Sequence, residues 1–140
     1  MRHYEVTFIV DPILSSDDVK ATGQKYVDMI SGEGYEITHV SEMGLLELAY
    51  PIKKRQSGVY YCIEFAGENG NVVDKYELAM RRDETLLRFL TVALDKWGVK
   101  YNADKRAGKI GSRKKVEAEL TEEIAAEVAA EAAAPATTEA

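Results

Sequence analysis

Basic side chains stand at several places where the sequence predicts that a strand or a helix begins or ends. The arginine guanidinium can donate two parallel hydrogen bonds to phosphate oxygens, and the lysine ammonium attracts them as a compact positive charge. Both residues therefore suit contacts with a polyanion such as RNA. Arg88 is the most informative, because a lone charge between Leu87 and Phe89 in a predicted strand must face solvent or a partner. The candidate contacts to RNA or to a partner protein are Arg2, Lys53, Lys54, Arg55, Arg81, Arg82 and Arg88.

Part of this set has a simpler explanation. Arg81 and Arg82 end a predicted helix, where the negative end of the helix dipole favours cations whatever the function. Residues 53–55 are also compatible with a solvated loop. Both alternatives stay open on the sequence.

A second basic segment follows the last predicted strand. Residues 96–115 carry eight basic residues and one acidic residue, whereas residues 1–95 carry ten basic and sixteen acidic residues. Residues 116–140 hold seven Glu and no Lys or Arg. The net charge of −6 alone argues against a polyanionic partner, but it conceals a basic arm between two acidic parts, and this distribution reopens the question. The candidate RNA contacts of the arm are Lys100, Lys105, Arg106, Lys109, Arg113, Lys114 and Lys115.

Motifs for catalysis or metal binding are not found. His3 and His39 fall on different predicted strands, and the one cysteine, Cys62, lies in the middle of another. The sequence has no glycine-rich phosphate loop, no nucleophile elbow and no multi-cysteine zinc pattern. We therefore expect neither enzymatic activity nor a cofactor or metal.

The lengths of the apolar runs in the sequence indicate whether the chain could span a membrane. None approaches the roughly 20 residues that a membrane-spanning helix needs. The start, "MRHYEVTFIV", lacks the pattern of a signal peptide, and a single cysteine suits a reducing compartment. We expect a cytoplasmic protein without a membrane partner.

Apolar periodicity predicts six elements. Strands are expected over 2–10, 35–52, 58–67 and 85–94, and helices over 15–34 and 70–82. Gly44 predicts a bulge or bend in the second strand, and "KKRQSG" predicts a wide hairpin loop. With right-handed crossovers, the order β-α-β-β-α-β predicts a ferredoxin-like α+β fold. Its four-stranded antiparallel sheet would carry both helices on one face.

The predicted helix ends and the chain's division into parts follow from the same pattern. Ser15 or Ser16 is the expected N-cap of the first helix, and Asn71 that of the second. Residues 1–97 are expected to form the RNA-binding domain. Residues 98–115 are expected to be an extended basic arm, and 116–140 an acidic tail that is disordered or transiently helical.

Three motifs resemble those of the bacterial small-subunit ribosomal protein S6 family. They are the opening "MRHYE", the stretch "GLLELAYPI" at 44–52 followed by basic residues, and the pair Arg82-Asp83. The resemblance covers about residues 1–97. It implies a ferredoxin-like fold that binds 16S rRNA in the central domain, the platform, as a heterodimer with ribosomal protein S18. It also implies contacts with other small-subunit components and a cytoplasmic location in the ribosome.

By position, the resemblance assigns roles to several of the basic residues. Arg2, the basic residues after Ile52, the Arg82-Asp83 corner and Arg88 fall where the family has residues that face RNA or the partner. The chain departs from the family at Leu46, where a basic residue is usual, and an acidic Glu47 follows. The resemblance therefore implies that a phosphate contact is lost or moved there, or that residue 46 packs against the partner.

Two alternatives complete the hypotheses. The strand "SGVYYCIEF" loosely resembles the aromatic consensus of RNA-recognition motifs, which would place stacked bases on the open sheet, although packing is the preferred interpretation. A small-molecule-binding regulatory module with the same βαββαβ order is the alternative to a structural RNA-binding protein.

Overall fold

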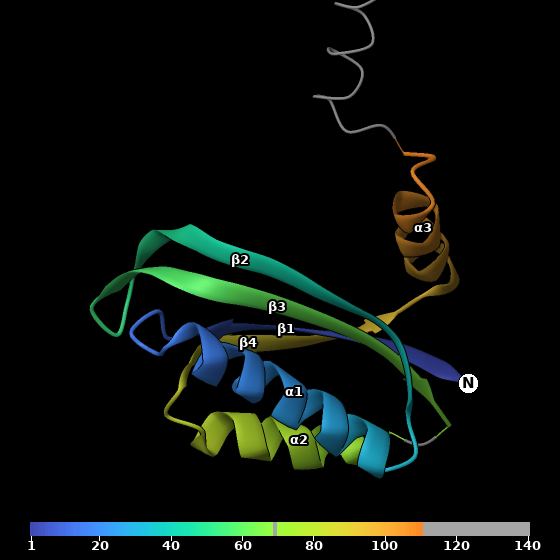
Figure 1. Cartoon of the computed structure of the whole chain (residues 1–140). Coiled ribbons are helices and arrows are strands. Elements are labelled where there is room, and N and C mark those ends of the chain that lie inside the picture. Colours follow the sequence, from blue (N-terminus) through green and yellow to red (C-terminus); the bar gives the residue numbers. More distant parts are fainter. Residues whose placement is uncertain (69, 111–140) are drawn as a thin grey trace, which may run out of the picture. The chain divides into compact units, whose positions relative to one another are not determined.

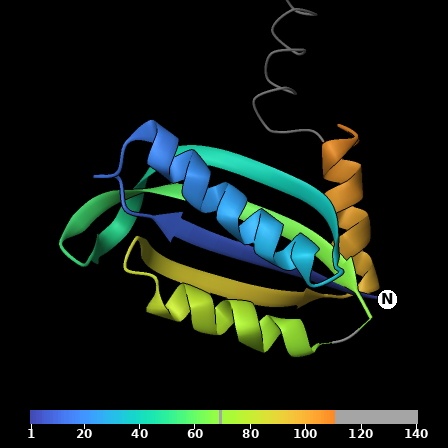
Figure 2. The ribbon, with the colours of Figure 1, turned by 60° about the horizontal axis from the view of Figure 1, so that its bottom comes forward.

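The computed structural model describes residues 1–68 and 70–110. The elements follow in the order β1 (Arg2–Val10), α1 (Ser16–Gly32), β2 (Glu36–Ile52), β3 (Arg55–Gly67), α2 (Asn71–Arg82), β4 (Leu86–Leu94) and α3 (Lys96–Arg106). The four strands form one antiparallel sheet in the order β2-β3-β1-β4, and α1 and α2 cover one face of it (Figure 1, Figure 2). The predicted ferredoxin-like fold is confirmed.

The core lies between the sheet and these two helices. Side chains alternate across a strand, so β1 buries one set of residues under the helices: Tyr4, Val6, Phe8 and Val10. The Phe8 ring stacks on the Tyr61 ring of β3 with centroids 5.5 Å apart, and Phe65 meets Tyr76 of α2 edge-on at 5.6 Å. Each fully buried large side chain contributes roughly 1.5–3 kcal/mol, so the two inner strands anchor the domain.

Helix α1 has the predicted cap. The Ser15 Oγ accepts a hydrogen bond from the backbone N–H of Asp18 at 3.2 Å. One face of the helix is buried: Val19, Gly23, Tyr26 and Ile30. Gly23 allows close contact, because a Cβ there would lie 2.9 Å from the Tyr61 ring.

Helix α2 differs from the prediction at its start. Its N-cap is Gly70, which makes no side-chain hydrogen bond, and Asn71 is already the first helical residue. The Asn71 cap prediction was therefore wrong. The short polar side chain of Asn71 suited a cap, which would have made Val72 the first helical residue. The buried face of α2 is formed by Val72, Tyr76 and Met80, and the helix begins one residue earlier, at Asn71.

The β2–β3 hairpin is tighter than predicted. Only Lys53 and Lys54 form the turn, with φ of 46° and 63°, and Ile52 pairs with Arg55 across it. A two-residue turn with both residues at positive φ matches the twist of the strands, so β3 begins at Arg55 and the wide loop over 53–58 was a wrong prediction. The predicted irregularity at Gly44 is confirmed, since its φ is 77° and the register shifts between Glu42 and Gly44.

Residues 96–106 form helix α3 in place of the extended segment expected there. The Asp95 carboxylate accepts a 2.6 Å hydrogen bond from the N–H of Gly98 at the start. At the end, Gly108 has a φ of 71° and the N–H of Lys109 bonds the carbonyl of Asp104 at 3.0 Å, as in a Schellman motif. The helix buries none of its residues, so it has no apolar periodicity for a sequence to show.

Met1–Val99 form one compact unit and Lys100–Ala140 a second, which the structure describes up to residue 110. The predicted arm residues Arg113, Lys114 and Lys115 and the tail 116–140 therefore lie outside the described residues. Among the helices that are described, none is long and apolar enough to cross a membrane. Within 1–68 and 70–110 there is also no group of side chains suited to hold a metal ion.

Candidate nucleic-acid interface

The tip of the β2–β3 hairpin folds over the start of β4, although β2 and β4 are the two outer strands of the sheet. The Nζ of Lys53 donates a 3.0 Å hydrogen bond to the backbone carbonyl of Leu86. Arg88 donates a hydrogen bond to the hydroxyl of Tyr50, and its guanidinium lies 5.5 Å from the centre of the Tyr50 ring. These contacts bring residues of the hairpin beside a strand to which it is not paired.

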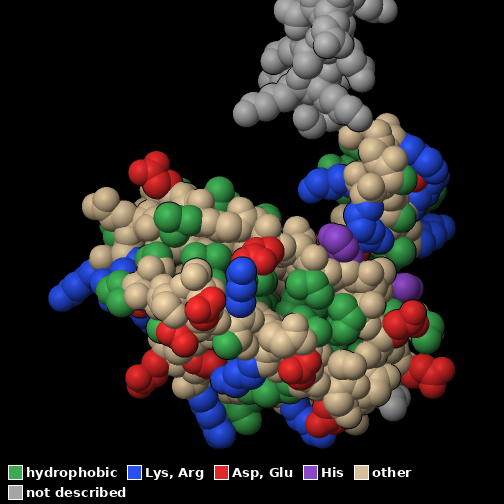
Figure 3. Space-filling view, viewed as in Figure 1, with side chains coloured by type: hydrophobic (Ala, Val, Ile, Leu, Met, Phe, Trp, Pro, Cys, Tyr) green, Lys and Arg blue, Asp and Glu red, His purple; other side chains and the backbone are tan. Residues whose placement is uncertain are grey.

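Three of the predicted basic residues meet at this end of the sheet. Lys53, Arg81 and Arg88 come from the hairpin, the end of α2 and the start of β4, and they line a shallow hollow of about 260 Å³. Its other lining residues are Asp83, Leu86, Leu87 and Phe89. We call this group of three the hairpin-end cluster; Figure 3 shows basic side-chain surface projecting at the left, where Figure 1 places the β2–β3 hairpin.

The one acid that lines the hollow, Asp83, is occupied by other partners. Its Oδ2 accepts hydrogen bonds from the Tyr26 hydroxyl at 2.6 Å and the Lys25 Nζ at 2.9 Å, and its Oδ1 accepts from Thr85. Burial favours the neutral acid, but the bonds from Thr85, Tyr26 and Lys25 outweigh it and hold the pKa of Asp83 far below its usual value. Asp83 therefore orders the corner between α2 and β4, and its charge is largely compensated by Lys25.

The remaining predicted residues near the hairpin lie in three different settings. Lys54 is exposed at the turn, and Arg82 is exposed at the end of α2. The Nε of Arg55 lies 3.1 Å from the Asp11 carboxylate, which follows β1. Asp11 therefore ties Arg55 to the body of the domain, and Lys54 and Arg82 extend the basic surface.

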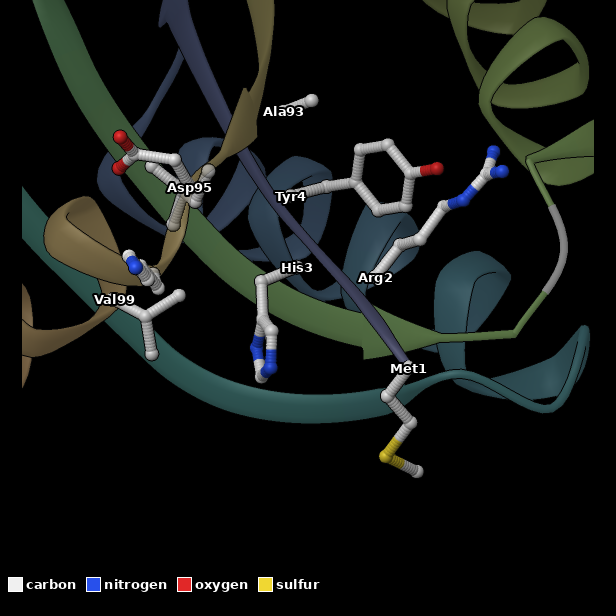
Figure 4. Close-up of a pocket in the computed structure, with 9 residues that line it drawn as sticks. Met1, Arg2, His3, Tyr4, Ala93, Asp95 and Val99 are labelled. Atoms are coloured by element: carbon white, nitrogen blue, oxygen red, sulfur yellow. The ribbon is translucent and has the colours of Figure 1, made fainter.

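Arg2 is not part of this cluster. It begins β1, whereas the hairpin lies beyond the other end of that strand, eight residues or roughly 26 Å away. Arg2 lines a separate pocket of about 650 Å³, shown in Figure 4, together with residues at the end of β4 and the start of α3. The seven candidate residues therefore divide between two ends of the sheet.

The candidate residues of the arm fall on α3 and just after it. Lys100, Lys105 and Arg106 lie on the helix, and Lys109 follows it. Lys109 forms an ion pair with Asp104 at 3.4 Å, which leaves 72% of its side chain exposed. The exposed lysines of this helix remain available to an anionic partner.

The open face of the sheet carries exposed apolar side chains. Leu46 and Leu90 are 44% and 64% exposed, and their pairing partners Gly58 and Thr7 place them on the face opposite the helices. Arg88 pairs with Ile9 and lies on the same face. The apolar face and the hairpin-end cluster are therefore continuous.

The aromatic third strand serves the core. Tyr61 is 4% and Phe65 1% exposed, on the helix-covered face. Burial, with a hydrogen bond to Glu42, raises the pKa of Tyr61 to about 12. These two rings are not available to stack bases, whereas Tyr60, which pairs with Ile9, lies partly exposed on the open face.

Two parts of the interface were missed from the sequence. Tyr50 is not among the predicted candidate residues, yet its side chain contacts Arg88. Asp11 is not among them either, yet its carboxylate forms an ion pair with Arg55. Both contacts join residues more than 35 positions apart, and local pattern gives no signal for them.

Comparisons with known proteins agree with this fold. Residues 3–93 match the family model described as ribosomal protein S6. The small ribosomal subunit protein bS6 of Bacteroides fragilis is 44% identical over 109 residues, which cover 78% of this chain and 95% of that protein. The bS6 of Flavobacterium johnsoniae is 40% identical over 114 residues, 81% of this chain and 99% of that protein.

A solved structure supports the fold independently. The 30S ribosomal protein S6 of Thermotoga maritima superimposes with a TM-score of 0.65 at 24% identity, covering 78% of this chain and 98% of that one. At that identity the match bears on the fold, and the family rests on the sequence comparisons. The chain belongs to the ribosomal protein S6 family, and it is accordingly a structural component of the small subunit of the cytoplasmic bacterial ribosome rather than an enzyme.

Proposed function

We propose that this protein binds 16S rRNA in the central domain of the small subunit, and that it does so as a pair with ribosomal protein S18. The observation that carries the RNA part is the convergence of Lys53, Arg81 and Arg88 on one hollow from three separate elements. Three cations held at one end of a rigid sheet match the phosphates of a folded RNA backbone.

The way these cations are held bears on what they recognise. Tyr50 orients the Arg88 guanidinium, and the Leu86 carbonyl orients the Lys53 ammonium. Groups fixed in this way select the spacing of phosphates in a particular RNA fold, because less rotamer entropy is lost on binding. Phosphate contacts carry no base sequence, so the proposed specificity is for the shape of the RNA.

The proposed S18 contact uses the open face of the sheet. Leu46 and Leu90 expose apolar surface there, at a place continuous with Arg88. The first 95 residues carry a net charge of −6, so a basic partner would also offset the repulsion between this domain and RNA. Leu46, where the family usually has a basic residue, supports packing against the partner rather than a phosphate contact.

The RNA contact is tested with a double variant, Lys53→Gln with Arg88→Gln, bound to a central-domain rRNA fragment in the presence of S18. Loss of two phosphate contacts should weaken binding at least tenfold and reduce the slope of log K against log salt by about two. Lys20→Gln, an exposed site on α1, is the matched control and should change neither quantity. Unchanged affinity and slope in the double variant would refute the assignment.

The partner contact is tested separately. Leu46→Glu with Leu90→Glu should weaken binding to S18 at least tenfold, measured by calorimetry without RNA, because it charges the apolar open face. Ile13→Glu places one such charge at another exposed apolar side chain, before α1, and should leave S18 binding intact. Equal effects of both changes would mean that the open face is not the docking surface.

The basic segment is assigned a supporting role. We propose that residues 1–97 form the rRNA-binding domain and that the basic residues of 98–115 lie along RNA. The exposed lysines of α3 support this for its described part. Deleting residues 98–115 should lower both the RNA affinity and its salt dependence, and no change in either would contradict the role.

A further inference from the structure

We infer that the end of the sheet opposite the hairpin is a second RNA site, which takes unpaired nucleotides of a single strand. The site is the pocket of about 650 Å³ at the start of β1, together with Trp97 beside it in the sequence of α3. The inference rests on the proposed RNA-binding function for the class of ligand. This second site differs from the hairpin-end cluster in its position on the sheet, in its residues and in the kind of RNA that it binds.

The pocket combines an apolar floor with cations. Tyr4, Leu94 and Val99 supply apolar surface, while Arg2 and Lys96 supply positive charge. Figure 4 shows Arg2 and Tyr4 extending to one side of β1 and His3 to the other, so the pocket takes in both faces at the sheet's end. Its volume lies within the roughly 300–1,000 Å³ of small-ligand sites, which is enough for a nucleotide.

The acid in the pocket does not cancel these cations. The Asp95 Oδ1 accepts the N–H of Gly98 at 2.6 Å and so caps the start of α3. The positive end of the helix dipole compensates part of a carboxylate charge at this position. Arg2 and Lys96 therefore leave the pocket positive, although the first 95 residues as a whole are acidic.

Trp97 presents a large aromatic surface that the domain does not use. Its side chain is 64% exposed, and the Lys96 Nζ lies 5.2 Å from the ring centre. Aromatic rings beside cations are what single-stranded nucleic acids stack upon, and bases held in a duplex cannot reach them.

The charge of α3 selects RNA over a protein as the occupant. Over residues 96–106 there are four basic residues and one acidic residue. Protein interfaces are poor in lysine at their centres, whereas nucleic-acid grooves combine lysines with exposed aromatics. A strand laid on this site would place phosphates by Arg2 and Lys96 and stack a base on Trp97.

Trp97 is the one tryptophan of the chain, so its fluorescence reports on this site directly. The full-length protein is titrated with a short oligouridylate and with an RNA duplex of the same length. Saturable quenching by the single strand, with an affinity about tenfold higher than that of the duplex, is the expected result. Absence of quenching, or equal affinity for the duplex, would overturn the inference.

Variants separate the two sites. Arg2→Gln with Lys96→Gln should weaken oligouridylate binding about tenfold, since two phosphate contacts are lost. Lys53→Gln with Arg88→Gln should leave it within about twofold while weakening the rRNA fragment. If the hairpin variant leaves the rRNA fragment unaffected, the proposed function fails while the oligonucleotide titration still decides this site. Equal losses of oligouridylate affinity in both variants would overturn a distinct site.

Removing the ring gives the most specific result. With a fluorescently labelled oligouridylate, Trp97→Ala should lower the affinity by about five- to a hundredfold, and Trp97→Phe should restore most of it. An unchanged affinity in Trp97→Ala would overturn the stacking role. Because α3 has no buried residue, neither change should affect the thermal midpoint of unfolding.

Discussion

At the scale of single residues, Asp83 and Tyr50 organise the hairpin end without being part of the predicted basic set. Asp83 joins α1 to the corner after α2 through Tyr26, Lys25 and Thr85. Tyr50 positions Arg88 from the far strand of the sheet. The cations at this end can act together because these two side chains fix the elements that carry them.

Asp83 makes the free energy of unfolding depend on pH in the acid range. Its pKa is lowered by folding, so its contribution is complete above the unfolded-state value of about 3.9 and is lost as the pH falls below it. Asp83→Asn should cost about 2 kcal/mol at pH 7, because the charged acceptor is lost. Urea unfolding at several pH values should show this difference shrinking below about pH 4. A difference that stays constant down to acid pH would contradict the network; Asp17→Asn, exposed on α1, is the control.

Tyr50→Phe tests whether Arg88 must be held in place. The change keeps the ring under the guanidinium and removes the hydroxyl that accepts its hydrogen bond. Since a single hydrogen bond contributes about 1 kcal/mol, we expect rRNA affinity to fall about two- to fivefold. The stability should be unchanged, because Tyr50 is exposed. Filter binding of the rRNA fragment measures the first quantity, and affinity equal to the wild type would show that orientation is unimportant.

At the scale of elements, the β2–β3 hairpin turn is a feature that the sequence pattern did not predict. The strands and both core helices could be predicted because apolar residues repeat with a period of two or of about four. The turn could not, because Lys53 and Lys54 adopt positive φ without the Asn-Gly residues that normally announce it. Helix α3 was missed for the complementary reason: its formation depends on an Asp95 cap and a Gly108 end, and no buried face reveals it.

We therefore expect the residues of the hairpin turn to favour RNA binding at a cost in the stability of the protein. Replacing Lys53-Lys54 by Asn-Gly relieves two side chains held at positive φ, and we expect a gain of about 1 kcal/mol in the free energy of unfolding. The same change removes Lys53 from the hairpin-end cluster, so rRNA affinity should fall by at least fivefold. Denaturant titration and filter binding measure the two effects. A variant that gained stability and kept its affinity would separate the turn from the interface.

At the scale of the whole molecule, the charges determine how the protein can bind RNA. A net charge of −6 over residues 1–95 repels RNA, and the hairpin-end cluster must act against it. The amino-acid composition alone shows that an acidic domain carries a few clustered basic residues. The family resemblance identifies the motif "GLLELAYPI" and the basic residues after it, which form the hairpin. The division of the predicted cations between two ends follows only from the strand register, which places Arg2 opposite Gly67 and Val10 opposite Val59.

The acidic domain predicts that binding is cooperative. The protein alone should bind the central-domain fragment at least tenfold more weakly than its proposed pair with S18, because in that pair S18 would supply contacts and offset the repulsion. Reciprocally, the rRNA fragment should strengthen the binding of S18 to this protein by the same factor. Titrations in each order at one salt concentration measure both factors. Equal affinity of the protein with and without S18 would contradict cooperation.

The central claim, that the hairpin end faces 16S rRNA, is tested most directly by local cleavage from the turn. In a Cys62→Ser background, Lys54→Cys provides one cysteine to which Fe(II) is tethered, and the protein is assembled into small subunits. Hydroxyl radicals formed there should cut the RNA in a few places within the central domain, and a tether at Lys20→Cys on α1 should give weaker or different cuts. Absence of central-domain cuts from position 54, with normal assembly, would contradict the account.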